Sequence, residues 1–255
     1  MATLTPILDK ELVKLRRRLG DIYDSSGTLI QFDTNPVPSG IWVGDAALMS
    51  TWTAAELLDC YNDAIRIFVD YCLKFLSIKS VGEFIPGYLV FSPNVQATKV
   101  TINTVDYWYV DIDNLTPKMY RIISAKDAND TRETSLGAYI PPEEFFASRI
   151  YRSRDNQLLY THGFIGSTVN KNCVIMLNLD SGEDVDLYYV KQHTDYVENN
   201  ASPGDVSGIT TAALRRIILI AEVIAQRYRS METRDIADSE LNIIMQSDAS
   251  LLGRK

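Results

Sequence analysis

The segment TAAELLDCYNDAIRIFVDYCLKFLSI, residues 53–78, decides the fold, because it predicts one long helix that is apolar around most of its circumference. Thr53 and Glu56 have the spacing of a capping box, which places the start of the helix at this threonine. Neither Gly nor Pro interrupts the run. A surface helix needs an apolar face on one side only. This helix therefore has to be covered from at least two sides, by other parts of the chain or by another chain.

Both ends of the sequence predict helices that can supply this cover. Four leucines recur at helical spacing in a first helix that ends at Gly20: Leu8, Leu12, Leu15 and Leu19. The basic residues at 14–18 suit the last turns of that helix, and we interpret them as a solvated helix end. Residues 210–230 return to a helical pattern with an apolar core at 217–221. This segment is the natural partner of the long helix.

The middle of the sequence changes from helical to strand periodicity at about residue 84. Six or so short segments rich in aromatic and β-branched residues follow, with turn residues between them. Residues 173–179 and 185–192 flank a Gly-containing loop at 180–184, a pattern that predicts a β-hairpin. Residues 198–208 have the composition of a linker. Together these strands favour an antiparallel sandwich or a small barrel.

The predicted fold class is therefore α+β, with a discontinuous domain organisation. Residues 1–83 and 205–255 form a helical bundle built from both termini, and residues 84–204 form an inserted antiparallel β domain. Residues 21–50 are a long arm or loop of the bundle. This loop is too apolar for a disordered linker, and it carries Phe32 and Trp42 without obvious cover. Two interpretations stay open, an arm that reaches a neighbouring subunit and a loop folded on its own domain.

Composition narrows the classes of function. The net charge is −8 and the pI is about 4.9, so the chain as a whole lacks the basic character of a nucleic-acid binder. The three cysteines match neither a disulfide framework nor a zinc pattern, and we expect reduced thiols in the core. The start of the sequence has no secretory signal pattern, and no apolar run is long enough for a membrane span. We expect a protein that is cytosolic when made and does not associate with membranes.

The sequence offers little catalytic chemistry. The sequence contains no nucleophile elbow with which either histidine, His162 or His193, could form a catalytic triad. Asp111-Ile112-Asp113-Asn114 resembles the start of a calcium loop, but the Gly and the closing Glu of that loop are absent. The aspartates around Gly182 are better explained as a solvated turn than as a cation site. We expect no enzyme activity, no metal site and no cofactor.

Two stretches resemble the head-to-tail adaptor (connector, head-completion) proteins of tailed bacteriophages. They are ELVKLRRRLGD at 11–21 and WTAAELLDCYNDAIRIF at 52–68. In such adaptors a short Leu/Arg helix ending in LGD is followed by a helix of the type W-[ST]-x-x-E-L-L-x-x-x-N-x-A. The residues that match here are Trp52, Thr53, Glu56, Leu57, Leu58, Asn62 and Ala64. The inserted β region and the return to a helix are also similar to these adaptors.

The resemblance implies a structural virion protein, assembled in the cytoplasm of the bacterial host. Adaptors of this family form a homo-oligomeric ring beneath the portal protein, usually a dodecamer, which connects the capsid to tail or neck proteins. DNA passes through the central channel without sequence-specific binding. A negative net charge agrees with this role, because it avoids the phosphate contacts that would retain DNA.

The C-terminal segment is the expected site of portal binding, since in the resembled family this part commonly docks on the portal. Residues 235–248 predict a short helix, too short to be stable alone in water. The expected contacts to a subunit or the portal, besides Phe32 and Trp42, are Ile236, Leu241, Ile244, Met245, Leu251, Leu252, Arg254 and Lys255. The alternative is that this helix folds back on its own bundle.

A second class of function stays open, a β-sandwich binding module of a phage tail or fibre. It would bind ligands on an aromatic surface made by Tyr107, Trp108 and Tyr109. Strand alternation places Trp108 on the opposite face from the two tyrosines. A sheet core with a covering helix explains the same three residues equally well.

Overall fold

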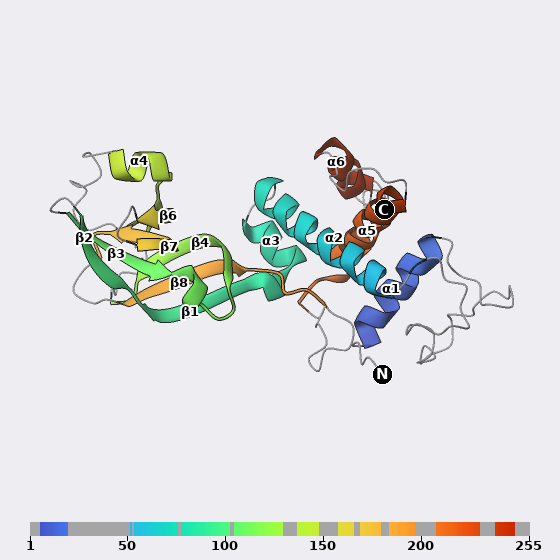
Figure 1. Ribbon diagram of the computed structural model, residues 1–255, viewed down its shortest axis with the longest axis horizontal. Helices are drawn as coiled ribbons and strands as arrows, with labels where there is room; N and C mark the ends of the chain where they lie inside the picture. The colour runs from blue at the N-terminus through green and yellow to red at the C-terminus, as the bar shows by residue number, and fades with distance from the viewer. Residues whose placement is uncertain are drawn as a thin grey trace, which may run out of the picture. The chain divides into compact units, whose positions relative to one another are not determined.

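The chain is a mixed helix and strand protein with two β-sheets (Figure 1). The computed structural model describes residues 6–19, 52, 54–75, 78–102, 105–129, 137–147, 158–165, 169–179, 184–196, 208–229 and 238–247. The predicted arm at 21–50 lies outside these residues. The chain divides into two compact units, Met1–Gly87 with His193–Lys255, and Tyr88–Gln192. The sequence had placed the insert at 84–204.

The first unit is helical. Its elements are α1 (Pro6–Arg18), α2 (Ala54–Phe75), α3 (Ile78–Phe84), α5 (Thr211–Arg229) and α6 (Asp238–Ser247). The predicted helix over 53–78 is confirmed as α2 over 54–75, and a separate helix, α3, begins at Ile78. Helix α3 packs on α2, and the ring of Phe84, its last residue, meets Phe68 edge-on at 6.4 Å between centroids.

Cover for α2 comes from within its own unit. It packs on α5, α1 and α3, and α2 and α5 lie side by side in Figure 1. The fully buried side chains of α2 lie on more than one face of the helix: Leu57, Tyr61, Ala64, Ile65, Phe68 and Cys72. The exposed residues form the narrow polar remainder, which includes Asp59, Arg66 and Asp70. The expected cover from at least two sides is confirmed, and the described helices of this chain supply it.

The second unit holds both sheets. The three-stranded sheet has the order β1 (Leu89–Gln96), β8 (Asp184–Lys191), β4 (Met119–Asp127), with antiparallel pairing throughout. The five-stranded sheet has the order β2 (Thr98–Ile102), β3 (Val105–Asp111), β7 (Val169–Leu177), β6 (Leu159–Ile165), β5 (Ala138–Tyr139). Short 3-10 helices lie at Pro86–Tyr88 and Ile112–Asn114. The second of these caps the end of β3.

Two details of strand pairing differ from the prediction. The expected hairpin of 173–179 with 185–192 is wrong, because β7 pairs with β3 and β6 whereas β8 pairs with β1 and β4. The connection therefore crosses from one sheet to the other. The insert is also not wholly antiparallel, since β5 runs parallel to β6. A parallel pair needs a crossover, and here the connection carries the helix α4 (Pro142–Ala147).

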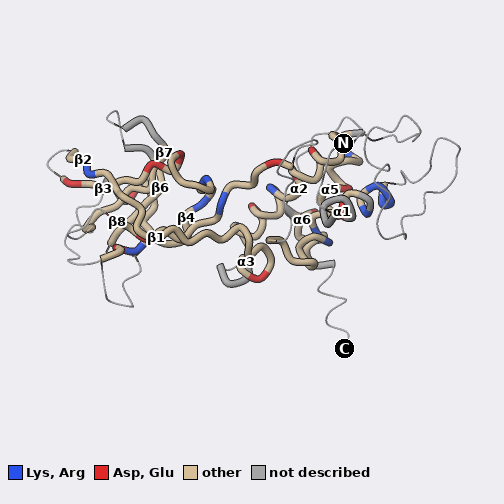
Figure 2. Tube along the Cα trace, turned by 90° about the horizontal axis from the view of Figure 1, so that it is seen from below, with Lys and Arg blue, Asp and Glu red and all other residues tan. Residues whose placement is uncertain are grey.

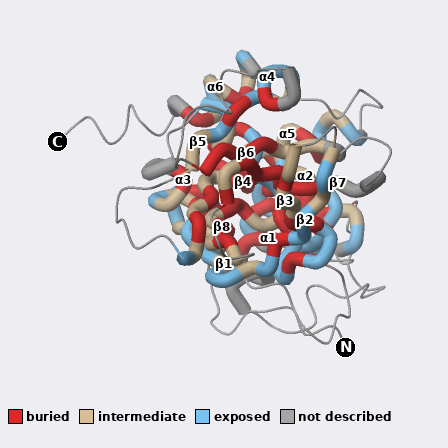
Figure 3. Tube along the Cα trace, turned by 90° about the vertical axis from the view of Figure 1, so that its left-hand side faces the viewer, coloured by how far each residue is buried: buried red, intermediate tan, exposed pale blue. Residues whose placement is uncertain are grey.

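The five-stranded sheet is buried on both faces. One apolar cluster draws on both sheets, with Val174 and Met176 of β7 packed with Leu187 and Tyr189 of β8. A second cluster covers the opposite face, where α4 contributes Phe145. In Figure 3, buried residues run through the middle strands, whereas β1 and β2 carry exposed residues. A strand buried on both faces has a continuous apolar sequence, which hides its sheet partner from a periodicity argument.

The aromatic residues of β3 belong to these two clusters. Tyr107 is buried beside Phe145 with 6.3 Å between ring centroids, and Tyr109 packs against the same cluster. Trp108 packs against the opposite cluster, and Lys99 Nζ lies 5.4 Å from the centroid of its ring. The predicted alternation of Trp108 with the tyrosines is confirmed. The covering helix is α4, and Tyr107 is not a surface residue.

Candidate functional site

The described residues of the two stretches that carry the adaptor resemblance lie together in the helical unit. Trp52 is buried, and its carbonyl oxygen accepts a hydrogen bond of 3.1 Å from Arg16 Nη2 on α1. Leu57, Leu58 and Ala64 are buried on α2. The two matching stretches, separated by 30 residues or more, are thus joined by a direct side-chain bond.

Arg16 differs from the expected solvated helix end. Figure 2 marks the basic last turn of α1, where Arg17 and Arg18 are exposed but Arg16 is buried. Arg18 forms an ion pair with Glu222 of α5. Arg16 is buried because its guanidinium donates a hydrogen bond to the carbonyl oxygen of the buried Trp52. Nothing in the local pattern of 14–18 distinguishes Arg16 from its neighbours.

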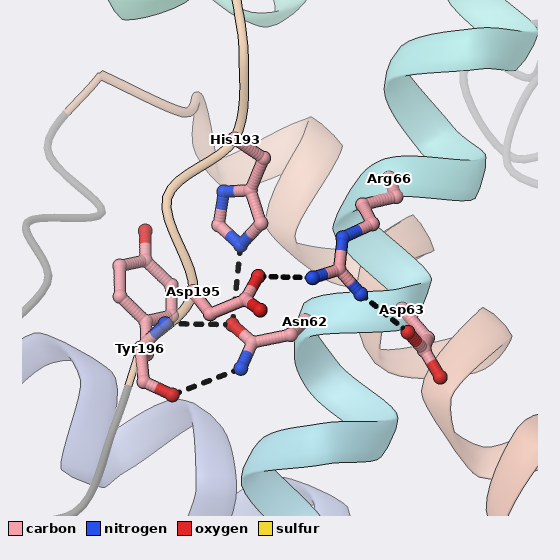
Figure 4. A network of polar contacts seen from close by, with 6 residues as sticks. All are labelled: Asn62, Asp63, Arg66, His193, Asp195 and Tyr196. Carbon is pink, nitrogen blue, oxygen red and sulfur yellow. Dashed lines mark hydrogen bonds and ion pairs between the residues drawn. The ribbon is translucent and has the colours of Figure 1, made fainter.

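Asn62 is the centre of the best-defined polar site (Figure 4). It lies on α2 and is only 3% exposed. Its Nδ2 donates to the carbonyl oxygen of Tyr196 at 2.9 Å, and its Oδ1 accepts from the backbone N–H of Tyr196, also at 2.9 Å. The amide thus pairs with both backbone groups of one residue, as a neighbouring strand would. This bond holds the segment that follows β8 on the long helix.

His193 completes the coordination of the same oxygen. Its Nε2 lies 3.1 Å from Asn62 Oδ1, which is an acceptor, so Nε2 carries the proton and donates. The ring also meets Tyr196 edge-on at 5.2 Å between centroids. Asn62 Oδ1 therefore has two donors and Nδ2 has its acceptor. The Asn62 side chain, satisfied in this way, fixes the position of the returning segment on α2.

A second layer of the site is charged and exposed. Arg66, one turn beyond Asn62, pairs with Asp63 at 2.6 Å and with Asp195 on the returning segment. Arg66 and Asp195 are each 46% exposed. Exposed ion pairs contribute little, typically about 0–1 kcal/mol. The buried amide of Asn62 is therefore the main contact, and the ion pairs support it.

The described residues do not assemble the catalytic or metal arrangements considered from the sequence. His162 lies in the other unit, on β6 opposite Val174. Burial lowers the pKa of His162, and a hydrogen bond with Asn172 opposes this shift. The carboxylate of Asp111 accepts the backbone N–H of Asp113 at 3.0 Å and caps a helical turn. Within the described ranges, no three His, Cys, Asp or Glu residues gather as a metal site.

The predicted partner-binding residues divide into two groups. Those outside the described residues are Phe32, Trp42, Ile236, Leu251, Leu252, Arg254 and Lys255. The others lie on α6, where Leu241 and Met245 are buried, Ile244 is half-buried and the neighbouring Ile243 is 68% exposed.

The position of α6 is fixed by contacts to its own unit. Tyr71 of α2 donates to Asn242 Oδ1 at 2.9 Å, and Arg227 of α5 pairs with Glu240. The helix therefore folds back on its own bundle, as in the alternative interpretation. While α6 keeps this position, Leu241 and Met245 are core residues and a partner can reach only its outer face, where Ile243 lies.

Comparison with known proteins adds no family assignment. No protein-family model matches the chain, and no curated protein matches it. In the part of the chain that the structure describes, none of the helices is both long enough and apolar enough to cross a bilayer. All three cysteines are buried thiols that form no disulfide, as expected for core residues.

Proposed function

We propose that this protein is a head-to-tail adaptor of a tailed bacteriophage. In this proposal it forms a homo-oligomeric ring, a dodecamer, between the portal protein and the tail or neck proteins, and DNA passes through its channel. It is a virion protein assembled in the bacterial cytoplasm, without catalytic activity. Its helical bundle carries an inserted β-sandwich, with the sheet pairing described above.

The observation that carries the proposal is the bond between the two matching stretches. In a chance match, the LGD helix and the W-[ST]-x-x-E-L-L helix have no reason to contact each other. Here Arg16 of the first bonds to Trp52 of the second, and Asn62 of the same motif binds the returning chain. The motif residues thus form one folded centre. This supports a common architecture, which in the resembled family serves ring assembly.

The test is the mass of the native particle, measured alone and after mixing with the portal protein of the same phage. We expect a ring, and a ring-on-ring complex with the portal. A monomer that ignores the portal under all conditions would contradict the proposal. The binding-module alternative is not favoured, since Tyr107 is a core residue and its hydroxyl-bearing ring packs on Phe145.

The role of the C-terminal tail is tested by two cuts. Removing residues 249–255 leaves α6 in place, so the variant should fold normally and lose portal binding. Removing everything after residue 230 also takes Leu241 and Met245 out of the core. We expect that second variant to be destabilised. Unchanged portal binding by the shorter deletion would show that the tail does not serve the junction.

A further inference from the structure

Arg216 is a buried cation of the helical unit, and no ion pair joins it to any residue that the structure describes. It lies in the second turn of α5 and is only 7% exposed. Its Nε and Nη1 are sealed from solvent, and neither has a hydrogen-bond partner among the described residues. A buried donor without a partner loses its hydrogen bonds to water and gains none in exchange, which destabilises the folded chain. An arginine buried at such a cost is unusual unless an acceptor completes it.

The neighbours of Arg216 do not neutralise it. Its Cζ lies over the ring of Phe84, 4.8 Å from the centroid, and this cation–π contact provides no hydrogen-bond acceptor for the N–H groups. Cys72 is the group that interacts with it electrostatically. Burial raises the pKa of the Cys72 thiol to about 12, against the opposing effect of Arg216, so the thiol is neutral at pH 7. It supplies no negative charge.

Hydrogen bonds hold the backbone of Phe84, the residue whose ring lies against the guanidinium. The carbonyl oxygen of Phe84 accepts from the backbone N–H of Thr210 at 3.0 Å and from its hydroxyl at 3.1 Å. Thr210 directly precedes α5 and also caps it, since its hydroxyl accepts from the N–H of Ala213 at 3.4 Å. The end of α3 is thus tied to the start of α5. These bonds hold the backbone of Phe84, which carries the ring that lies against the guanidinium.

We propose that Arg216 is an oxyanion-binding site, which takes a phosphate, sulfate or carboxylate group. The planar fork of a guanidinium matches two oxygens of such a group, and the charged hydrogen bonds are stronger than neutral ones. Nη2 is the guanidinium nitrogen that is not among the buried, unpartnered atoms of Arg216, and in this proposal the anion approaches through it. A small rotation of the guanidinium then turns a second N–H toward the ligand.

The neighbouring residue provides a matched control. Arg215 has the same charge on the same turn of α5, but it is exposed. The test measures the melting temperature of the full chain in phosphate and in sodium chloride at equal ionic strength, for the wild type, Arg216→Gln and Arg215→Gln. Equal ionic strength removes general screening from the comparison. Wild type and Arg215→Gln should show a saturable rise in melting temperature with phosphate, and Arg216→Gln should lose it.

The variants also distinguish this site from a structural arginine. Without phosphate, Arg216→Gln should melt at or above the wild-type temperature, because it removes an unpaired buried charge. A lower melting temperature at every phosphate concentration would mean that Arg216 only packs on Phe84, and would overturn the proposal. Equal phosphate responses in the two variants, or none in the wild type, would also overturn it. If Arg216→Gln does not fold, phosphate line broadening by NMR is compared between wild type and Arg216→Lys, which should bind more weakly.

The mass of the native particle distinguishes the two possible sources of the oxyanion, a free anion and a second copy of the chain. If phosphate raises the melting temperature and leaves the mass unchanged, the ligand is a free anion. If phosphate and Arg216→Gln each lower the mass, the ligand is a carboxylate of a second copy, displaced by phosphate. Both results support the site. Neither depends on the adaptor proposal, because binding of phosphate by a monomer would establish the site without any ring.

Discussion

Different kinds of contact stabilise the inside of the helical unit and the inside of the β unit. In the helical unit, segments far apart in the sequence meet through buried side chains that bond to backbone groups: Arg16 to Trp52, and Asn62 to Tyr196. In the β unit, the strands meet through backbone ladders, and two apolar clusters fill the space beside them. The first kind of contact depends on the identity of single polar residues, whereas the second depends on volume and apolarity.

This difference predicts different responses to substitution. A ladder survives most side-chain changes that keep the apolar pattern, because the backbone supplies its bonds. In the helical unit, the described segments on either side of the insert are joined by a few backbone bonds, such as Gly87 N–H to Gly208, and by side-chain bonds. The contacts between these segments have to be specific. Substitutions there should therefore lower the free energy of unfolding more than comparable substitutions in the β unit do.

The largest effect is expected from the core of the helical unit. Phe68 is fully buried and meets Phe84 edge-on. Phe68→Ala should lower the free energy of unfolding by about 3–5 kcal/mol, the usual cost of removing a buried phenyl ring. Urea unfolding followed by far-UV circular dichroism measures this. Phe75→Ala is the control on the same helix, since Phe75 is 44% exposed and should cost less than about 1 kcal/mol. Equal costs for the two variants would contradict the assigned helix face.

Next is the close approach of two glycines of the helical unit, Gly87 at the point where the chain leaves the unit and Gly208 just before α5. Gly87 N–H donates to the carbonyl of Gly208 at 2.9 Å, and a Cβ on Gly87 would lie 2.3 Å from the Cα of Gly208. The obstacle is backbone, which cannot rotate away. Gly87→Ala should therefore cost about 3 kcal/mol, the upper part of the range for overpacking.

The β unit offers the control for this prediction. A Cβ on Gly163 of β6 would meet nothing within 4 Å. Gly163→Ala should leave stability unchanged or raise it by about 0.5–1 kcal/mol, since alanine loses less backbone entropy. The measurement is again the urea midpoint. If both alanine variants are neutral, the two segments are not in contact in solution.

The same contrast explains how much could be predicted from the sequence. The helices at 6–18, 54–75 and 211–229 follow from apolar periodicity, because each has a covered face and a polar remainder. Strand locations followed from β-branched and aromatic content, but strand partners did not. The segment at 173–177 is buried without interruption, so nothing in it indicates which neighbour it pairs with.

Buried polar residues were the harder part of the site. Arg16 and Arg216 have the same local sequence character as the exposed arginines beside them, and only the tertiary fold separates them. Asn62 stood in the adaptor motif but had no assigned role. A polar residue on the apolar side of a helix is a usable signal, because burial without a partner is costly. For Asn62, that signal was present and its partner, the backbone of Tyr196, was not visible in any pattern.

A smaller loss is expected from the polar site on α2. Asn62→Ala leaves the backbone N–H and C=O of Tyr196 without their partner, which should cost about 1–3 kcal/mol. Arg66→Ala removes only exposed ion pairs and should cost less than about 1 kcal/mol. Hydrogen exchange gives a second readout, because the amide of Tyr196 should lose protection in Asn62→Ala only. Equal loss of protection in both variants would make the ion pairs, and not the amide, the main contact.

The smallest effect concerns His162 in the β unit, and it appears only at acid pH. Burial lowers its pKa in the folded chain from the ordinary value of 6.5, and a hydrogen bond with Asn172 partly offsets this. Below pH 6.5 the unfolded chain takes up a proton that the folded chain resists, so stability should fall as the pH drops toward the folded-state pKa. Above pH 6.5 both states are neutral and the contribution is absent.

His162→Gln should therefore flatten the dependence of the urea midpoint on pH between neutrality and mild acid, while the wild type loses stability there. The half-buried position of the ring keeps this difference small. Other groups titrate in the same range, so the comparison is made between slopes and not between absolute midpoints. A variant whose slope matches the wild type would mean that the ring is solvated, and that β6 opens at this end of the sheet. That result would place His162 among the mobile parts of the β unit and weaken the contrast between a rigid, ladder-held insert and a bond-specific helical unit.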